Sequence, residues 1–199
     1  MLGRLLLAAA ACIVLATAVA CNPAPSVTPT QPSPQEKPEQ TTTAAGFSLT
    51  SEHFKPGETI PPRFTCDGAN ISPELAWSNA PPGTVTFALI ADDPDAPSGV
   101  YTHWVIFDVP AAVHSLLSGV PRAEQLDNGA IQGRNDAGSI GYTGPCPPSG
   151  THHYRFTVYA LNAKLELQPG ATKQQVLEAM KGHILGQAQL VGTYQRVLR

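Results

Sequence analysis

The chain has 199 residues and a formal net charge of −3, with 15 acidic against 12 basic side chains. These charges are spread along the sequence and form no basic stripe, which argues against nucleic acid as a partner. About 150 residues follow the N-terminal segments described next, enough for one domain with a single hydrophobic core.

Residues 1–20 have the organisation of an export signal, with one positive charge at Arg4 before an almost wholly apolar stretch. That stretch is short for a membrane-spanning helix. The sequence Ala-Val-Ala-Cys at 18–21 is similar to a bacterial lipobox, although Ala18 stands where Leu is usual. Processing there would attach lipid such as palmitate to Cys21 and anchor the protein to a membrane. The alternative is ordinary cleavage, which leaves a free protein.

Residues 21–45 begin with the candidate lipidated cysteine and are otherwise Pro, Thr, Ser, Gln and Glu with hardly any large apolar group. Such a segment cannot bury enough surface to fold, and its prolines keep it extended. We therefore expect a disordered tether over 21–45 and one folded domain over 46–199. The predicted location is the bacterial cell envelope, lipid-anchored and outside the cytoplasm.

The domain has a mainly β pattern, because β-branched and aromatic runs alternate with Pro, Gly and Asn. The predicted strands are 47–50, 75–77, 85–91, 103–109 and 154–161, with a closing strand at 188–197. Nearly continuous apolar runs at 85–90 and 104–107 predict strands buried on both faces. Polar residues alternate over 154–159, so one face of that strand is expected to be wetter. Strands with turn signals every eight to twelve residues or so favour a sandwich or a barrel.

One helix is predicted near the C-terminus. Thr172 is a good N-cap, and Gln175 three residues later completes a capping box. Val176, Leu177 and Met180 should then share one face of the helix. Gly182 is expected to end it.

Two cysteines remain once Cys12 leaves with the signal and Cys21 takes lipid. Cys66 and Cys146 both stand in Pro- and Gly-rich surroundings. An exported domain with two such residues suggests a disulfide, and two free thiols are the alternative. No paired Cys spacing indicates a metal site, and no cofactor is expected.

A stiff acidic turn, Asp-Asp-Pro-Asp-Ala-Pro at 92–97, follows a buried strand. Its prolines fix φ and limit the freedom of the carboxylates, which suits them to orient a histidine or to accept a ligand hydrogen bond. The alternative is a polar turn whose Asp caps its own backbone. His103 opens the next strand, and an Asp-to-His hydrogen bond would raise its pKa and favour an anion-binding imidazolium.

A second stiff loop, Gly-Pro-Cys-Pro-Pro-Ser-Gly, occupies 144–150. Its glycines would let a ligand approach the backbone closely. His152 and Tyr154 are two residues apart and face the same side of a strand, whereas His153 faces the other side. The alternative for Tyr154 is a core aromatic with its hydroxyl tied to a loop. If the fold brings the two turns together, they build a small rigid pocket.

These motifs resemble the phosphatidylethanolamine-binding protein family, in particular its bacterial Raf-kinase-inhibitor-like branch. The resemblance rests on Asp-Pro-Asp-x-Pro at 93–97, on His103 and on Gly-Pro-x-Pro-Pro-x-Gly-x-His-x-Tyr at 144–154, and it spans 47–196. It implies a Greek-key β-sandwich with one or two short peripheral helices and a small anion pocket. The family's pocket positions fall on Asp93, Asp95, Pro97, His103, Gly144, Pro145, His152 and Tyr154.

The sequence departs from the family at His153, where Arg is usual, so the ion pair made by that Arg is not expected here. The resemblance implies a non-enzymatic binding protein for a small anion or a phosphorylated headgroup, with a role in modulating an envelope partner. The alternative is a peptidase inhibitor or another protein-interaction module. A serine hydrolase is disfavoured, because Ser139 lies in a sequence with Ala137 where a nucleophile elbow needs Gly.

Overall fold

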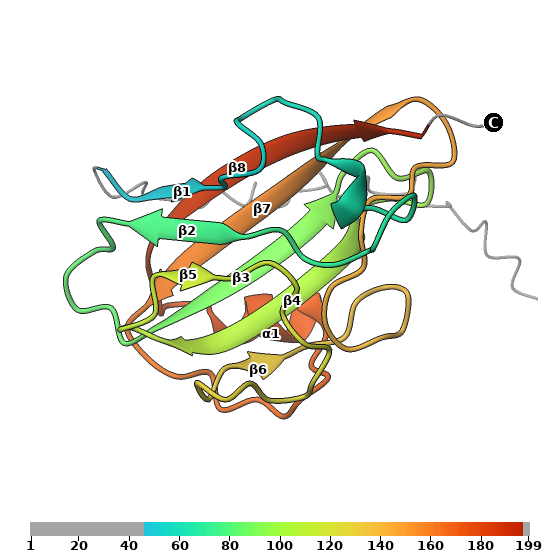
Figure 1. The fold of residues 1–199 in the computed structure, drawn as a ribbon. Coiled ribbons are helices and arrows are strands. Elements are labelled where there is room, and N and C mark those ends of the chain that lie inside the picture. The colour runs from blue at the N-terminus through green and yellow to red at the C-terminus, as the bar shows by residue number, and fades with distance from the viewer. Residues whose placement is uncertain (1–45, 197–199) are drawn as a thin grey trace, which may run out of the picture. The chain divides into compact units, whose positions relative to one another are not determined.

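The computed structural model describes residues 46–196, which form two antiparallel β-sheets with one short α-helix (Figure 1). The smaller sheet has the order β1-β2-β5, with bounds β1 (Ser48–Thr50), β2 (Leu75–Ser78) and β5 (Ser115–Leu116). The larger sheet has the order β6-β4-β3-β7-β8, with bounds β6 (Ile131–Gln132), β4 (Tyr101–Pro110), β3 (Thr86–Asp93), β7 (Thr151–Leu161) and β8 (Ile184–Gln195). The prediction of a mainly β fold is confirmed.

The large sheet is covered on both faces, which explains the continuous apolar run of β3. Phe87 and Leu89 pack with the small sheet in one core cluster, while Ala88 and Ile90 belong to a second cluster. The second cluster includes Val176 of α1 (Lys173–Ala179) and its C-cap residue Met180. In Figure 1 the small sheet lies in front of the large one and α1 lies behind it. Strand alternation thus sends successive apolar side chains into two separate cores.

Helix α1 carries the predicted capping box. The Thr172 hydroxyl accepts a hydrogen bond from the Gln175 amide, and the Gln175 side chain accepts one from the Thr172 amide. Val176 and Met180 are fully buried, but Leu177 is 37% exposed, so the three predicted core residues do not share one face. The helix ends at Ala179, before Gly182, because Met180 already closes it as the C-cap.

Several boundaries differ from the predictions. Strand β4 begins at Tyr101, two residues before His103, and β7 and β8 begin at Thr151 and Ile184, earlier than expected. The alternation predicted over 154–159 is only partly present, because Arg155 and Tyr159 are half-buried but Thr157 is buried; clear alternation between exposed and buried residues occurs over 151–154. The short elements β5, β6 and the 3-10 turn η1 (Pro62–Phe64) were not predicted.

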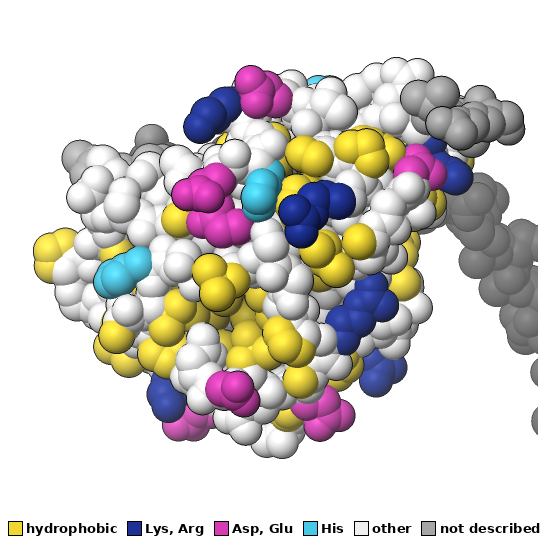
Figure 2. Space-filling model, in the orientation of Figure 1, with side chains coloured by type: hydrophobic (Ala, Val, Ile, Leu, Met, Phe, Trp, Pro, Cys, Tyr) yellow, Lys and Arg dark blue, Asp and Glu magenta, His cyan; other side chains and the backbone are white. Residues whose placement is uncertain are grey.

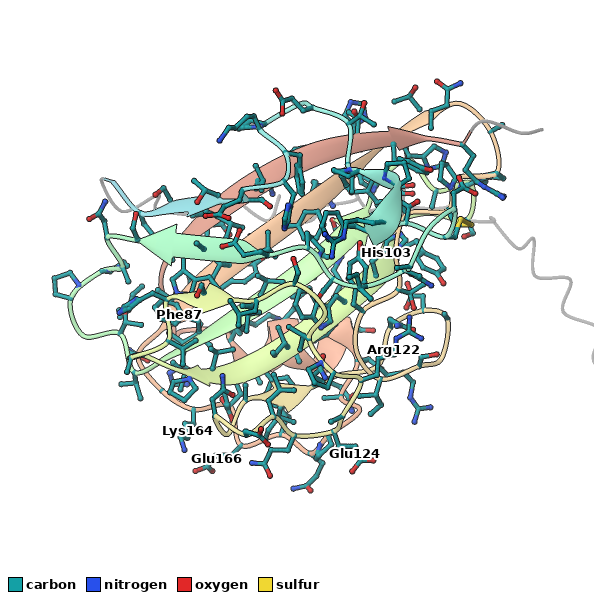
Figure 3. The ribbon with its side chains drawn as sticks, in the orientation of Figure 1. Phe87, His103, Arg122, Glu124, Lys164 and Glu166 are labelled. Atoms are coloured by element: carbon teal, nitrogen blue, oxygen red, sulfur yellow. A yellow bond between two sulfur atoms is a disulfide. The ribbon has the colours of Figure 1, made fainter. Side chains whose placement is uncertain are left out.

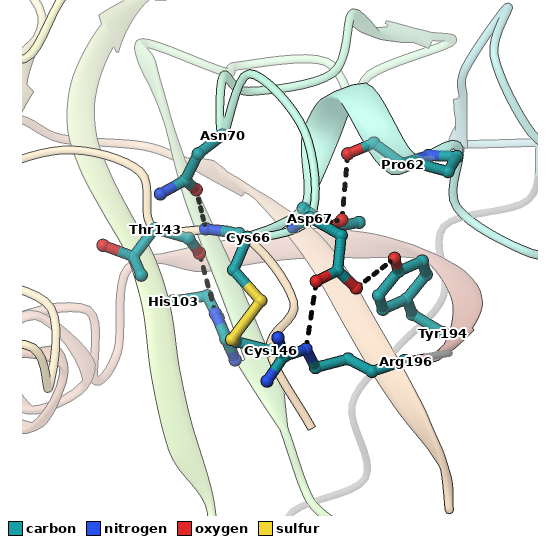
Figure 4. Close-up of a disulfide and its surroundings, with 11 residues drawn as sticks. Pro62, Cys66, Asp67, Asn70, His103, Thr143, Cys146, Tyr194 and Arg196 are labelled. Carbon is teal, nitrogen blue, oxygen red and sulfur yellow. Dashed lines mark hydrogen bonds and ion pairs between the residues drawn. A yellow bond between two sulfur atoms is a disulfide. The ribbon is translucent and has the colours of Figure 1, made fainter. Parts of the chain in front are cut away.

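The predicted signal and tether, including Cys21, lie outside the described residues. Within residues 46–196, no helix is long and apolar enough to span a bilayer. Cys66 and Cys146 are joined by a disulfide, with their Cα atoms 5.4 Å apart (Figure 4), in agreement with the prediction. This bond links the turn after η1 to the loop before β7.

Candidate functional site

The two Pro-rich turns meet at one end of the large sheet and enclose a cavity of about 260 Å³. Sheet register brings them together, because Asp93 at the end of β3 pairs with Tyr101 at the start of β4, and the neighbouring Asp92 pairs with Arg155 of β7. Figure 3 shows His103 at the end of the sheet opposite Phe87. The cavity is lined by Asp93, Ala96, Pro97, Ser98, Tyr101, His103, Thr143, Gly144, Cys146, Pro147, Pro148 and His152.

Asp93 and His152 form a buried pair at the base of the cavity. The Asp93 Oδ2 atom lies 2.7 Å from the His152 Nδ1 atom, and the two residues are only 4% and 7% exposed. The other carboxylate oxygen accepts a hydrogen bond from the Asp95 amide. Asp93 therefore both orients a histidine and caps its own turn, which combines the two interpretations that the sequence left open.

His103 does not pair with an acid, contrary to the bond considered from its sequence position. Its Nδ1 atom lies 2.7 Å from the carbonyl oxygen of Thr143, which can only accept, so Nδ1 donates (Figure 4). Burial lowers the pKa of His103, and this outweighs the opposing effects of the Thr143 carbonyl and of the Asp93 carboxylate. His103 is therefore held as a neutral imidazole rather than as the expected imidazolium.

Asp95 does not line the cavity. Its carboxylate accepts hydrogen bonds from the amide and from the Nδ1 atom of His153, at 2.8 and 2.7 Å, on the exposed side of the turn. These bonds from His153 lower the pKa of Asp95. His153, which stands where the family usually has Arg, thus pairs with Asp95 on the exposed side of the turn.

Tyr154 lies beneath the two histidines as part of the core. Its ring centroid is 5.2 Å from that of His103 and 6.5 Å from that of His152. Its hydroxyl has no hydrogen-bond partner of ordinary geometry among the described residues, so it is not tied to a loop. Desolvation, followed by the nearby Asp93 carboxylate, raises its pKa, which keeps the phenol protonated. The buried hydroxyl therefore interacts with the Asp93 carboxylate and not with a loop.

Gly144 and Pro145 shape the rim by docking one loop on another. A Cβ atom at Gly144 would lie 2.3 Å from the Phe64 carbonyl oxygen, so glycine is required for loop packing rather than for ligand approach. The Gly144 amide donates to Asn70, and the Pro145 carbonyl accepts from the Cys66 amide. The disulfide then reinforces this contact, while Pro97 contributes to the opposite rim.

Sequence reasoning missed several lining residues, of which Tyr101 is the most informative. Its ring centroid is 4.9 Å from that of His103. The spacing of two residues on one strand, already applied to His152 and Tyr154, would have placed Tyr101 beside His103. Ser98 and Thr143 carried no comparable signal, because they stand in irregular loops.

A larger cavity, of about 530 Å³, lies along the connection between β5 and β6, over residues 115–128. Figure 2 shows hydrophobic side chains around a hollow on this face. Asp127 is the single charged side chain in its lining, and it contains no histidine. The titratable chemistry is therefore concentrated in the smaller cavity.

No group of three His, Cys, Asp or Glu side chains within 46–196 is arranged to hold a metal ion. Ser139 lies in a turn in which its amide donates to Asn135, and no helix follows it directly. The turn therefore lacks the strand-to-helix geometry of a nucleophile elbow.

The fold is a β-sandwich with a small cavity at one end, where Asp93, His103 and His152 meet. Residues 50–195 match the family described as phosphatidylethanolamine-binding protein. The UPF0098 protein of Methanothermobacter thermautotrophicus is 54% identical over 150 residues, which cover 75% of this chain and 99% of that protein. Crystalline Escherichia coli YbcL, described as a new member of the mammalian PEBP family, superposes with a TM-score of 0.72 at 35% identity and covers 77% of this chain and 100% of its own.

The candidate lipoprotein LppC of Mycobacterium tuberculosis is 41% identical over 174 residues, which cover 86% of this chain and 80% of that protein. The chain therefore belongs to the phosphatidylethanolamine-binding protein family, as its motifs predicted. The match with LppC covers a larger share of this chain than the match with the archaeal protein does.

Proposed function

We propose that the protein binds a small anion or a phosphate-bearing headgroup in the cavity at the end of the large sheet. The observation that carries the proposal is the convergence of Asp93, His103 and His152 from three different strands on one small cavity. The buried Tyr154 hydroxyl lies beneath them, close to the Asp93 carboxylate. Three prolines and a disulfide stiffen the rim, which limits the ordering that a ligand has to impose.

The volume of the cavity favours a headgroup over a whole lipid. About 260 Å³ is below the usual range for drug-sized ligands, roughly 300–1,000 Å³. A phosphoryl group with a short substituent fits that space, whereas acyl chains would stay outside. The ligand class we propose is therefore phosphate and its small monoesters, including phosphoethanolamine.

We further propose that binding rather than catalysis is the role of this site. Ser98 lines the cavity, but its hydroxyl makes no hydrogen bond with His103 or His152 among the described residues. The Nδ1 atoms of both histidines are occupied by a carbonyl and a carboxylate. The arrangement thus lacks the nucleophile–base contact on which hydrolases depend.

We infer a lipid-anchored location outside the cytoplasm. The similarity to LppC supports lipid attachment at Cys21. The Cys66–Cys146 disulfide also fits an oxidising compartment, because such bonds are rare in the cytosol. The anchor and the tether would hold the pocket close to lipid headgroups.

Titration calorimetry with inorganic phosphate and phosphoethanolamine tests the binding proposal. His103→Ala and Asp93→Ala should each weaken binding more than tenfold, because losing a hydrogen bond to a charged group costs about 1.5–3 kcal/mol. His183→Ala is the matched control, since that exposed histidine contacts Asn162 away from the cavity. Unchanged affinity in both cavity variants would defeat the assignment.

A further inference from the structure

The larger cavity, of about 530 Å³, begins at the free edge of a β-sheet. Strand β5 is an outermost strand of the small sheet, and β2 is its neighbour on the inner side. The cavity is lined by side chains between Ser115, in β5 itself, and Asn128. Figures 1 and 2 share one orientation and show the hollow between β5 and β6, on the side of β5 away from β2.

The register of β5 shows which of its main-chain groups are unused. The Trp77 amide donates to the His114 carbonyl, so His114 and Leu116 direct their amide and carbonyl groups towards β2. Ser115 and Leu117 alternate with them and direct theirs the other way. The Leu117 groups have no partner within residues 46–196, and the register leaves those of Ser115 unpaired as well. The edge therefore presents N–H donors and C=O acceptors to the cavity.

A second main-chain edge lines the same cavity. Residues 124–126 pair with 130–132 through hydrogen bonds at Glu124 and Leu126, which flank Gln125. Gln125 lies between these bonds and therefore directs its own amide and carbonyl away from β6. It is also part of the cavity lining. A guest in the cavity would thus meet unpaired main-chain groups that belong to both sheets.

The side chains along these edges are mostly apolar. Leu116, Val120 and Leu126 line the cavity, and Leu117 beside them is 75% exposed. Native proteins usually protect a sheet edge with a charged residue, a proline or a bulge. Residues 115–117 are Ser-Leu-Leu, without a charge or a proline. This edge is therefore open to pairing with another strand.

We propose that the cavity binds an extended segment of a protein partner, which adds a strand to the edge of β5 and places alternate apolar side chains in the hollow. Unpaired main-chain groups in the lining favour a peptide over an apolar small molecule, because a peptide supplies donors and acceptors at the spacing of a strand. The site shares no lining residue with the anion cavity, so this inference does not depend on the proposed function.

The charges around the cavity indicate what kind of segment fits. Asp127 is the single charged residue of the lining, and Glu124, three residues before it, is exposed. A segment with Lys or Arg beside its apolar residues would complement these acids. The chain's own residues 21–45 fit poorly, because their many prolines have no amide hydrogen to donate.

Selection of random heptapeptides displayed on phage, with the purified protein as target, identifies the preferred segment. We expect the enriched sequences to have apolar residues at alternate positions, to lack proline at their centre and to carry Lys or Arg. Excess phosphate should leave their binding unchanged, because the two cavities have no lining residue in common. Absence of enrichment, enrichment without this pattern, or competition by phosphate would overturn the proposal.

Methylation of the amides of a selected peptide, one at a time, tests for strand addition. Sensitivity should have a period of two, because alternate amides of an added strand face β5. Methylation at those positions should weaken binding more than about tenfold, and methylation at the intervening positions should weaken it less. Uniform or absent sensitivity would show that side chains alone hold the peptide and would refute strand addition.

Leu117→Pro removes an outward amide hydrogen from the protein. Leu117→Ala is the matched control, since it shortens the same side chain and keeps that hydrogen. The proline variant should bind the selected peptide at least about tenfold more weakly than the alanine variant. Equal affinities of the two variants would overturn the proposal.

Hydrogen exchange tests the same edge in the unaltered protein. The amides of Ser115 and Leu117 should exchange at least about tenfold more slowly when the peptide is bound. The amide of Gln174, in the first turn of α1, should be unaffected, because α1 lies behind the large sheet. Unchanged exchange at the edge would contradict strand addition. A dimer of the purified protein that Leu117→Pro abolishes would assign the edge to a second copy of the chain and would also overturn the proposal.

Discussion

Asp92 and Asp93 are neighbours in β3, yet they serve opposite purposes. Asp92 accepts hydrogen bonds from the Arg155 Nε atom, at 2.8 Å, and from the Lys173 Nζ atom, so two cations neutralise it. Asp93 accepts hydrogen bonds from His152 and from the Asp95 amide, lies near the Tyr154 hydroxyl, and forms no ion pair with Arg or Lys among the described residues. Because successive strand residues face opposite sides, the same residue type meets a structural ion cluster on one face and a cavity on the other. Charge compensation, rather than residue type, separates the structural acid from the acid that lines the cavity.

Removal of the disulfide should have the largest effect of the proposed changes. It should affect the cavity that Asp93 lines and leave the Asp92 ion pairs intact. The disulfide closes a loop of 80 residues and includes Cys146 of the cavity rim. Replacing both cysteines by serine should lower the free energy of unfolding by about 4 kcal/mol on the chain-entropy view. It should also weaken phosphate binding, whereas the Asp92 ion pairs remain.

Urea unfolding of the wild type and the double variant measures this effect. Free-thiol titration of the exported protein should find neither Cys66 nor Cys146 reactive. A stability loss below about 1 kcal/mol would show that the three hydrogen bonds between the linked loops already hold them together.

Asp92→Ala should destabilise the fold by removing the ion cluster around Asp92, without changing the cavity. Removing the carboxylate leaves Arg155 and Lys173 without their shared partner, which in a buried cluster costs 3–5 kcal/mol. Since the Arg155 side chain is about one-third exposed, we expect a smaller loss, of about 2–3 kcal/mol. Chemical denaturation gives this value, and calorimetry of the folded variant should show phosphate affinity within about twofold of the wild type. A large loss of affinity with little loss of stability would reverse the roles assigned to the two acids.

Asp95→Asn should have the smallest effect, because its pair with His153 is exposed. The pKa of Asp95 is lowered in the fold, chiefly by the His153 side chain, so its contribution is present above the unfolded pKa and is lost as the pH falls through the folded pKa. At neutral pH the variant should be destabilised by no more than about 0.5 kcal/mol. The difference should disappear below about pH 3 in urea titrations. A difference that persists there would assign the effect to packing.

Much of the site could be predicted from the sequence, because stiff turns at strand ends restrict where their side chains lie. Asp93, His103 and His152 do converge, and the capping box at Thr172 is local enough to be predicted from residue types. Asp95 could not be placed in this way. The period of two applies only within a strand, and β3 ends at Asp93, so Asp95 turns outward.

The sequence also could not predict which group each histidine contacts. The choice between Asp93 and the Thr143 carbonyl depends on how loop 141–150 packs on the turn after η1. That packing is a long-range contact with no local signal. Strands β5 and β6 could not be predicted for a similar reason. Each has only two residues and is defined by its pairing with a neighbouring strand, β2 or β4, that is distant in the sequence.

The proline-rich rim has a consequence for how this pocket can diversify. Phosphate sites built from main-chain amides keep their preference when side chains change, since the peptide groups that hold the ligand are common to all residues. Here Pro97, Pro147 and Pro148 have no amide hydrogen to donate. Recognition in the proposed site therefore depends more on a few side chains on rigid strands. If the site binds a headgroup as proposed, one substitution at such a position can change the preferred headgroup without rebuilding a loop, so members of one fold can acquire different ligands in small steps.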